Sequence, residues 1–382
     1  MEGKHNGRQS NFELLRLLAM LMIVGSHYAA HGIELCTVEG EAYRLWGEGD
    51  LLHRLFTAFL NPGGAVGVGL LFMISGYFQI KKEKPSLTRL ALECYFYAGV
   101  SLVLAAAVLL AGGTIPGMAG KNLLAYLARA VLIPITSTCW WFVAVYVFLM
   151  LLSPVVNRFL LSLNRRGFLW LLLLGWALWY AAAQVLGTEF FDLQKALFFY
   201  SLGAYLRLWG RKVSAQGLKD VLATLLGWGA AACCFYLDGE LALGRGPFGG
   251  ELAAKGVALL ENGFAVPLCA FGLFRLFSLS EMGVKPGVNR LAATTFGVYL
   301  LHDSLIARPL IWYSLLKPAE RQYPSAAYPL LALLTILGLF LLCAGLDYLR
   351  LHFLEPGALK KAEAVKEKLK ARFGAGQPAN KS

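Results

Sequence analysis

The sequence predicts an all-α polytopic membrane protein with about ten transmembrane helices, and three observations support this fold class. Of the 382 residues, 58% are hydrophobic and only 15% are charged, whereas soluble proteins carry about 25% charged residues. The mean hydropathy is +0.58, and apolar runs of about eighteen or more residues, long enough to cross a bilayer, recur along the chain. The longest polar gap, roughly Gly32–Pro62, is shorter than a soluble domain.

Ten apolar segments follow one another at short intervals, and each is read as a helix because of its length and its polar boundaries. They cover about 14–31, 64–80, 88–111, 140–158, 168–187, 192–209, 218–236, 256–278, 291–313 and 327–352. The first contains ionisable residues, the second ends before a run of lysines, and the fourth opens on two tryptophans typical of a membrane interface. The eighth is interrupted by Glu261, Asn262 and Pro267.

The basic residues are distributed unevenly between the two sides of these helices. The net charge is +12, which in a soluble protein would suggest nucleic acid binding. Here the positive-inside rule explains it better, because 25 of the 35 basic residues lie at one side when the N-terminus is placed in the cytoplasm. We therefore expect both termini in the cytoplasm, an even number of helices, a multi-pass position in the plasma membrane and no nucleic acid partner.

The composition changes near residue 354. Residues 10–353 hold the apolar segments, whereas 354–382 contain ALKKAEAVKEKLKARF, which predicts a basic amphipathic helix. Such a helix typically lies on an anionic membrane surface. We expect a transmembrane domain over 10–353 and a cytoplasmic tail over 354–382.

The first apolar segment carries the most informative pair of residues, Arg16 and His27. Ten residues separate them, so a helix places both side chains on one face with about 16 Å of rise between them. Glu13 and His31 extend this stripe to either side. Ionisable groups inside a membrane helix are costly and indicate function. Histidine suits proton transfer near neutral pH, although Arg16 is equally explained as a structural partner of Glu13.

The second apolar segment offers a candidate binding surface for a phosphorylated ligand. Its glycines allow a neighbouring helix to approach closely, and Ser75–Gly76 interrupts the run just before a basic cluster that includes Lys84 and Arg89. Lysines and arginines at a surface opening attract phosphate groups. The alternative is helix packing followed by ordinary inside-positive charge.

Further polar or aromatic residues in the predicted helices are candidates for lining a cavity. His302 and Asp303 lie within one apolar segment, where an unpartnered carboxylate is expensive. The remaining candidates are Trp141, Tyr146 and Glu261. The seven cysteines show no metal-ligand spacing, so no metal is expected.

The chain resembles acyltransferase family 3, a family of bacterial integral membrane proteins. The resemblance rests on Arg16-x10-His27, LFMISGYF, WWFVAVY with LLSPVVN, FFYSLGAYLRLW and FGVYLLHD, and it covers about residues 10–352. It implies a ten-helix protein that transfers an acyl group, by default acetyl, from acyl-CoA to a hydroxyl of a cell-surface or lipid-linked saccharide. It also implies no permanently bound cofactor and an essential histidine, which corresponds to His27.

The resemblance implies a division of labour among these residues. Arg16 corresponds to the arginine of the motif, and the acyl-CoA would contact the basic opening formed by Arg16, Lys84, Arg89, Ser75, Gly76 and Arg207. His27 would act as general base, while His31, His302, Asp303, Glu261, Trp141 and Tyr146 would contact the acceptor or line the cavity. The alternative from the residues alone is a proton-coupled transporter or flippase of a saccharide or small anionic solute.

Overall fold

The protein is helical throughout the residues that the structure describes. The computed structural model describes residues 9–34, 43–83, 87–115, 120–132, 134–135, 140–186, 191–210, 217–245 and 250–374. Its α-helices are α1 (Ser10–Ala29), α2 (Arg44–Glu48), α3 (Leu51–Leu60), α4 (Gly63–Gln79), α5 (Thr88–Leu110), α6 (Gly120–Leu132), α7 (Trp141–Ser162), α8 (Arg165–Leu174), α9 (Ala182–Leu186), α10 (Phe191–Trp209), α11 (Gly217–Ala242), α12 (Glu251–Ala258), α13 (Val266–Leu279), α14 (Pro286–Ala292), α15 (Thr295–His302), α16 (Ala307–Pro309), α17 (Pro318–Arg321), α18 (Tyr328–Leu349) and α19 (Glu355–Gly374). Wider π-helical turns occur at η1 (Ala30–Glu34), η2 (Gly175–Ala181), η4 (Leu259–Ala265), η5 (Leu310–Leu316) and η6 (Arg350–Leu354).

Seven helical stretches within the described ranges are long and apolar enough to cross a membrane. They are Ser10–Glu34, Leu51–Gln79, Thr88–Leu110, Trp141–Ser162, Gly217–Ala242, Glu251–Leu279 and Tyr328–Val365. These stretches confirm an all-helical protein with several potential spans. The described residues of all ten predicted segments are mainly helical, while a count of ten spans and the position of the termini remain predictions.

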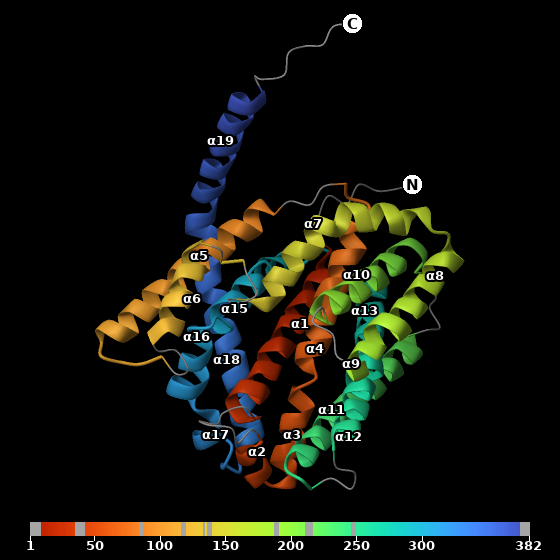
Figure 1. The fold of residues 1–382 in the computed structure, drawn as a ribbon, viewed down its shortest axis with the longest axis vertical. Helices are drawn as coiled ribbons and strands as arrows, with labels where there is room; N and C mark the ends of the chain where they lie inside the picture. Colours follow the sequence, from red (N-terminus) through yellow and green to blue (C-terminus); the bar gives the residue numbers. More distant parts are fainter. Residues whose placement is uncertain are drawn as a thin grey trace, which may run out of the picture.

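Helix α1 lies in the middle of the bundle and is the element that the others surround (Figure 1). It contacts α3, α4, α13, α14, α15 and α18. The approach of α4 depends on glycines, as the sequence predicted: a Cβ on Gly67 would lie 2.6 Å from the carbonyl oxygen of Ala19. On its other side α4 packs against α10, where a Cβ on Gly76 would lie 1.9 Å from the carbonyl oxygen of Tyr200. Small residues thus bring three backbones together.

The structure departs from the sequence expectations in three places, and one of them is α6, a helix in a stretch for which none was predicted. The polar gap contains α2 and α3. The Asp50 side chain caps the start of α3 by accepting a hydrogen bond from the His53 amide, and α3 ends at Leu60, shortly before α4 begins at Gly63. The segment 291–313 is a series of short helices instead of one. It breaks after His302, where the hydroxyl of Ser304 accepts a hydrogen bond from the amide of Ala307.

The two ends of the bundle differ in their surroundings. Figure 1 shows α2, α3 and α17 gathered at one end, whereas α19 projects away from the opposite end. Helix α19 covers most of the predicted tail, and residues 375–382 lie outside the described ranges. The division at residue 354 remains a prediction, since α18, η6 and α19 follow one another without a gap.

Candidate active site

Helix α1 presents its ionisable residues in the order that the sequence predicted. Near its start, the Arg16 guanidinium forms an ion pair with the Glu13 carboxylate at 2.6 Å, and the Arg16 side chain remains 29% exposed. The predicted pairing is therefore confirmed. His27 follows three turns later, and a π-helical turn at the end of α1 carries His31.

Helix α15 and the break that follows it bring three further polar residues to His27. The two ring nitrogens Nδ1 of His27 and Nε2 of His302 lie 2.9 Å apart. The carboxylate of Asp303 lies 3.6 Å from the same His27 nitrogen, and Arg308 Nε donates to it at 2.8 Å. Asp303 reaches this position because the chain leaves the helical conformation after His302. Residues about 275 positions apart in sequence thus meet inside the bundle.

The hydrogen bonds of His302 determine which nitrogen of His27 carries a proton. The Nδ1 of His302 lies 2.6 Å from the carbonyl oxygen of Val298, and a carbonyl only accepts, so this nitrogen is the donor. In a neutral His302 the Nε2 is then an acceptor, which requires His27 to donate from its Nδ1. A neutral His27 consequently has an unprotonated Nε2, the atom needed by a general base.

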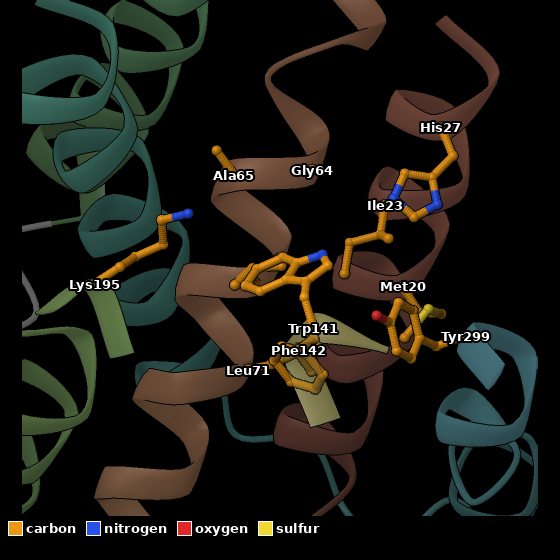
Figure 2. A pocket seen from close by; sticks show the side chains of 11 residues that line it. Met20, Ile23, His27, Gly64, Ala65, Leu71, Trp141, Phe142, Lys195 and Tyr299 are labelled. Carbon is orange, nitrogen blue, oxygen red and sulfur yellow. The ribbon is translucent and has the colours of Figure 1, made fainter. Parts of the chain in front are cut away.

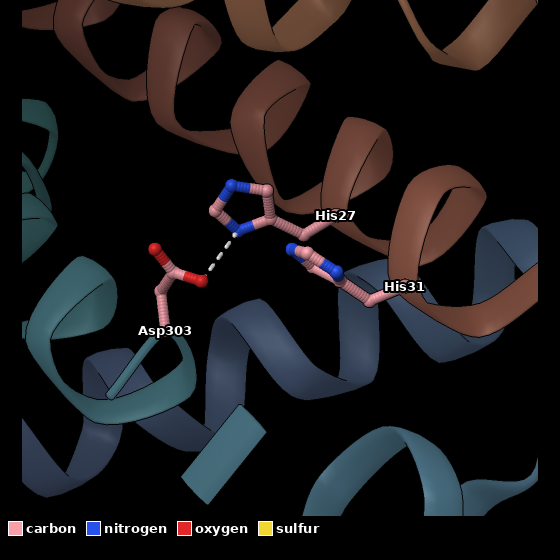
Figure 3. Close-up of side chains that lie close together, drawn as sticks. All are labelled: His27, His31 and Asp303. Carbon is pink, nitrogen blue, oxygen red and sulfur yellow. Dashed lines mark ion pairs between the residues drawn. The ribbon is translucent and has the colours of Figure 1, made fainter. Parts of the chain in front are cut away.

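His27, His31 and Asp303 also resemble a set of metal ligands. Figure 3 shows the three side chains converging, and their donor atoms lie within 4.8 Å of one another. The acidic member is already paired with Arg308, however, and Nδ1 of His27 is used in the contact with His302. Hydrogen bonds thus account for the cluster as it stands, and we assign it no metal.

A chamber of about 160 Å³ lies beside His27. Figure 2 shows side chains from α1, α4, α7, α10 and α15 around it. Its polar or aromatic lining residues are His27, Trp141, Phe142, Lys195 and Tyr299. The rest of its wall is apolar or glycine.

A second cavity of about 320 Å³ lies nearer the start of α1. Arg16, Ser75, Arg89, Glu93, Tyr146 and Thr295 line it together with apolar residues. Both cavities share Met20, Leu71 and Phe142 as lining residues. They therefore adjoin, and together they follow α1 from Arg16 to His27, about 16 Å by the helical rise.

The remaining predicted donor-binding residues have mixed positions. Arg89 lines the second cavity, but its guanidinium pairs with Glu355 of α19 at 2.7 Å. Gly76 packs against the backbone of α10 and lines neither cavity. Arg207 stacks on Tyr77 at 5.0 Å and lines neither cavity. Lys84 lies outside the described residues.

The predicted acceptor-side residues divide in the same way. His302 and Asp303 contact His27, and the His31 ring centroid lies 5.4 Å from that of His27. Trp141 lines the chamber, whereas Tyr146 lines the second cavity. Glu261 lies in η4 and lines neither cavity.

Two chamber residues, Lys195 and Tyr299, were missed by sequence reasoning. Lys195 pairs with Asp192 at 3.3 Å and lies 5.3 Å over the ring of Trp141. A signal for Lys195 existed, because it is a basic residue at the opposite end of α10 from Arg207, where the positive-inside rule predicts few. Tyr299 gave no such signal among the many aromatic residues of the chain.

Comparisons with known proteins identify the family of the chain. No curated protein and no solved structure matches it. The model of the acyltransferase domain that defines acyltransferase family 3 matches residues 9–346, nearly the entire chain. The match covers α1, the chamber and the cluster around His27. The chain therefore belongs to acyltransferase family 3.

Proposed function

We propose that this membrane protein transfers an acyl group from cytoplasmic acyl-CoA to a hydroxyl of an extracytoplasmic or lipid-linked saccharide, with His27 as general base. The observation that carries the proposal is the pair of adjoining cavities, one lined by Arg16 and the other by His27. A long, thin donor with an anionic head fits such a path. The family supplies the reaction class, acyl transfer.

The donor enters at the Arg16 end in this proposal. Acyl-CoA carries phosphates and cannot cross lipid, so its nucleotide binds where arginine is accessible. Arg16 is partly exposed, and Arg89 lines the same cavity. The excess of basic residues favours this side as cytoplasmic. With this orientation we place both termini in the cytoplasm and the tail on the anionic inner leaflet, and we propose the plasma membrane as the location.

The thioester reaches the chamber once the pantetheine arm lies between Met20, Leu71 and Phe142. His27 Nε2 takes the proton of the acceptor hydroxyl while its oxygen attacks the thioester carbonyl carbon. The carbon–sulfur bond then breaks, and the CoA thiolate leaves with the proton from His27. Asp303 stabilises the imidazolium that forms, since its carboxylate lies 3.6 Å from the ring nitrogen. A positioned base contributes typically about 10²–10⁴-fold.

The proposed donor and acceptor are chosen for their chemical fit to the cavities and for the resemblance to the family. The chamber volume of about 160 Å³ is small, which favours acetyl as the acyl group. A saccharide is the proposed acceptor because it offers hydroxyls to the side of the membrane opposite the donor. No permanently bound cofactor is needed, since the donor itself is consumed.

Binding of CoA to the purified protein separates this proposal from a proton-coupled transporter or flippase of a saccharide or small anionic solute. A CoA site predicts a higher melting temperature in the presence of CoA, by mass action, and a weaker effect for Arg16→Ala. A saturating CoA concentration without any shift would support the transporter.

Labelled acetyl transfer in membranes tests the role of His27 directly. We expect His27→Ala to abolish transfer at an unchanged protein level, and His27→Gln, which keeps a polar side chain but no base, to be equally inactive. Transfer at the normal rate by either variant would disprove general-base catalysis by His27.

A further inference from the structure

The first turn of α7 lies beside the chamber. Trp141 and Phe142 belong to this turn and line the chamber. Trp140 precedes the helix in extended conformation and supplies no capping side chain, and the first helical hydrogen bond runs from Ala144 to its carbonyl. The earlier N–H groups of α7 have no carbonyl within the helix to bind. A helix of 22 residues also carries partial positive charge at this end.

Tyr299 supplies a second hydrogen-bond donor at the same place. Its residue is 4% exposed, and its hydroxyl makes no hydrogen bond of normal geometry among the described residues, although the backbone amide of Phe142 and the carboxylate of Asp303 lie near it. Its ring packs 5.6 Å from that of Phe142. In Figure 2 the hydroxyl points toward the other side chains of the chamber. A buried hydroxyl without a good hydrogen bond is destabilising and calls for an explanation.

We propose that the Tyr299 hydroxyl and the N-terminal amides of α7 form an oxyanion site for acyl transfer. This inference rests on the proposed function. When the acceptor oxygen bonds to the thioester carbon, the carbonyl π electrons move onto the carbonyl oxygen. The phenol hydroxyl and the amides donate hydrogen bonds to this oxyanion. The electrons return to re-form the carbonyl as the carbon–sulfur bond breaks and the thiolate takes the proton from His27.

The charges around the chamber permit a negative oxygen there. The nearest acidic group in the cluster, Asp303, is paired with Arg308 at 2.8 Å, which offsets its charge. His27 becomes positive in the same step and lines the same chamber. Preorganised donors in a shielded site stabilise developing charge more than they would in water. The base and the oxyanion site thus lie on two sides of one chamber.

Turnover of acetyl-CoA, measured as released CoA thiol with the native acceptor or water as nucleophile, tests the role of Tyr299. Tyr299→Phe removes only the hydroxyl oxygen. We expect kcat to fall by about 10²-fold or more, as for loss of one oxyanion donor, with KM for acetyl-CoA unchanged. The matched control is Tyr126→Phe, because Tyr126 is a 3% exposed tyrosine of α6 that lines neither cavity. This variant should keep the native kcat. An unchanged kcat for Tyr299→Phe overturns the inference.

A spectroscopic measurement gives an answer that does not depend on turnover. The probe is the methyl ketone analogue of acetyl-CoA, in which CH₂ replaces sulfur and the carbonyl is ¹³C-labelled. Hydrogen bonds to the carbonyl lower its stretching frequency, so the bound probe should absorb at a lower frequency in the native protein than in Tyr299→Phe. Equal frequencies overturn the oxyanion site alone, whereas failure of the probe to bind the native protein overturns the proposed function with it.

Discussion

The contact between His302 and His27 offers the sharpest test of how the base is prepared. His302 is fully buried, and its Nε2 lies 2.9 Å from Nδ1 of His27. Replacement by leucine removes this acceptor while nearly preserving side-chain volume. His27 is then free to place its proton on Nε2, where it blocks base catalysis. The imidazolium formed during transfer also loses its hydrogen-bond partner.

The expected loss is derived from the hydrogen bond that is removed. A hydrogen bond to a charged group contributes about 1.5–3 kcal/mol, which corresponds to about a 10- to 150-fold lower rate. We expect kcat of His302→Leu to fall within this range, with KM for acetyl-CoA unchanged because the cavity near Arg16 is untouched. The assay is acetyl-CoA turnover by purified protein, with the melting temperature of each variant measured in parallel.

A conservative variant distinguishes positioning from general damage. His302→Gln retains a side-chain oxygen able to accept from His27, so it should recover part of the rate. Wild-type kcat in His302→Leu would refute the tautomer reasoning. Equal losses of kcat in His302→Leu and His302→Gln, with the melting temperature of each unchanged, would also count against the tautomer reasoning.

Three further predictions concern packing, charge and donor binding. Gly76→Ala should lower the free energy of unfolding by about 1–3 kcal/mol through overpacking against α10. The control is Gly338→Ala, whose added Cβ meets no neighbouring atom within 4 Å and should leave the stability unchanged. Equal melting temperatures for the two variants would contradict this. Arg350→Leu leaves the buried acidic groups around it uncompensated and should lower the free energy of unfolding by about 3–5 kcal/mol, measured by denaturant unfolding. A variant as stable as the native protein would show that the ion network contributes little. Arg16→Gln should weaken CoA binding by about tenfold in titration calorimetry, which corresponds to the loss of one phosphate contact of roughly 1.4 kcal/mol. Glu13→Gln should leave CoA binding unchanged. Unchanged binding in Arg16→Gln would leave Arg16 a structural role.

The sequence predicts those features that depend on local pattern. Long apolar runs locate the helices, and the three-turn spacing of Arg16 and His27 places them on one face of α1. Glycines spaced along the second segment predict close approach, although not which helix approaches. The pairing of Glu13 with Arg16 follows from a spacing of three on a helix.

The remaining features depend on contacts between distant parts of the chain. The break after His302 occurs where the Ser304 side chain caps a new turn. The mean hydropathy of this apolar segment does not indicate the break. Whether His302 orients the acceptor or His27 depends on the packing of α15 against α1, which no periodicity encodes. The partner of Arg89 lies in the tail, at Glu355. Tyr299 gains its importance only from its position in the chamber, where the folded chain buries its hydroxyl.

Sidedness of acetyl transfer tests the central claim most directly. Sealed membrane vesicles of known orientation, carrying the protein and its native saccharide acceptor, are supplied with labelled acetyl-CoA on one face only. The account predicts labelled saccharide when the donor reaches the face bearing Arg16, no label when it is supplied to the opposite face, and none with His27→Ala on either. Labelling from the opposite face, or from His27→Ala, would contradict a donor path that runs along α1 from Arg16 to His27.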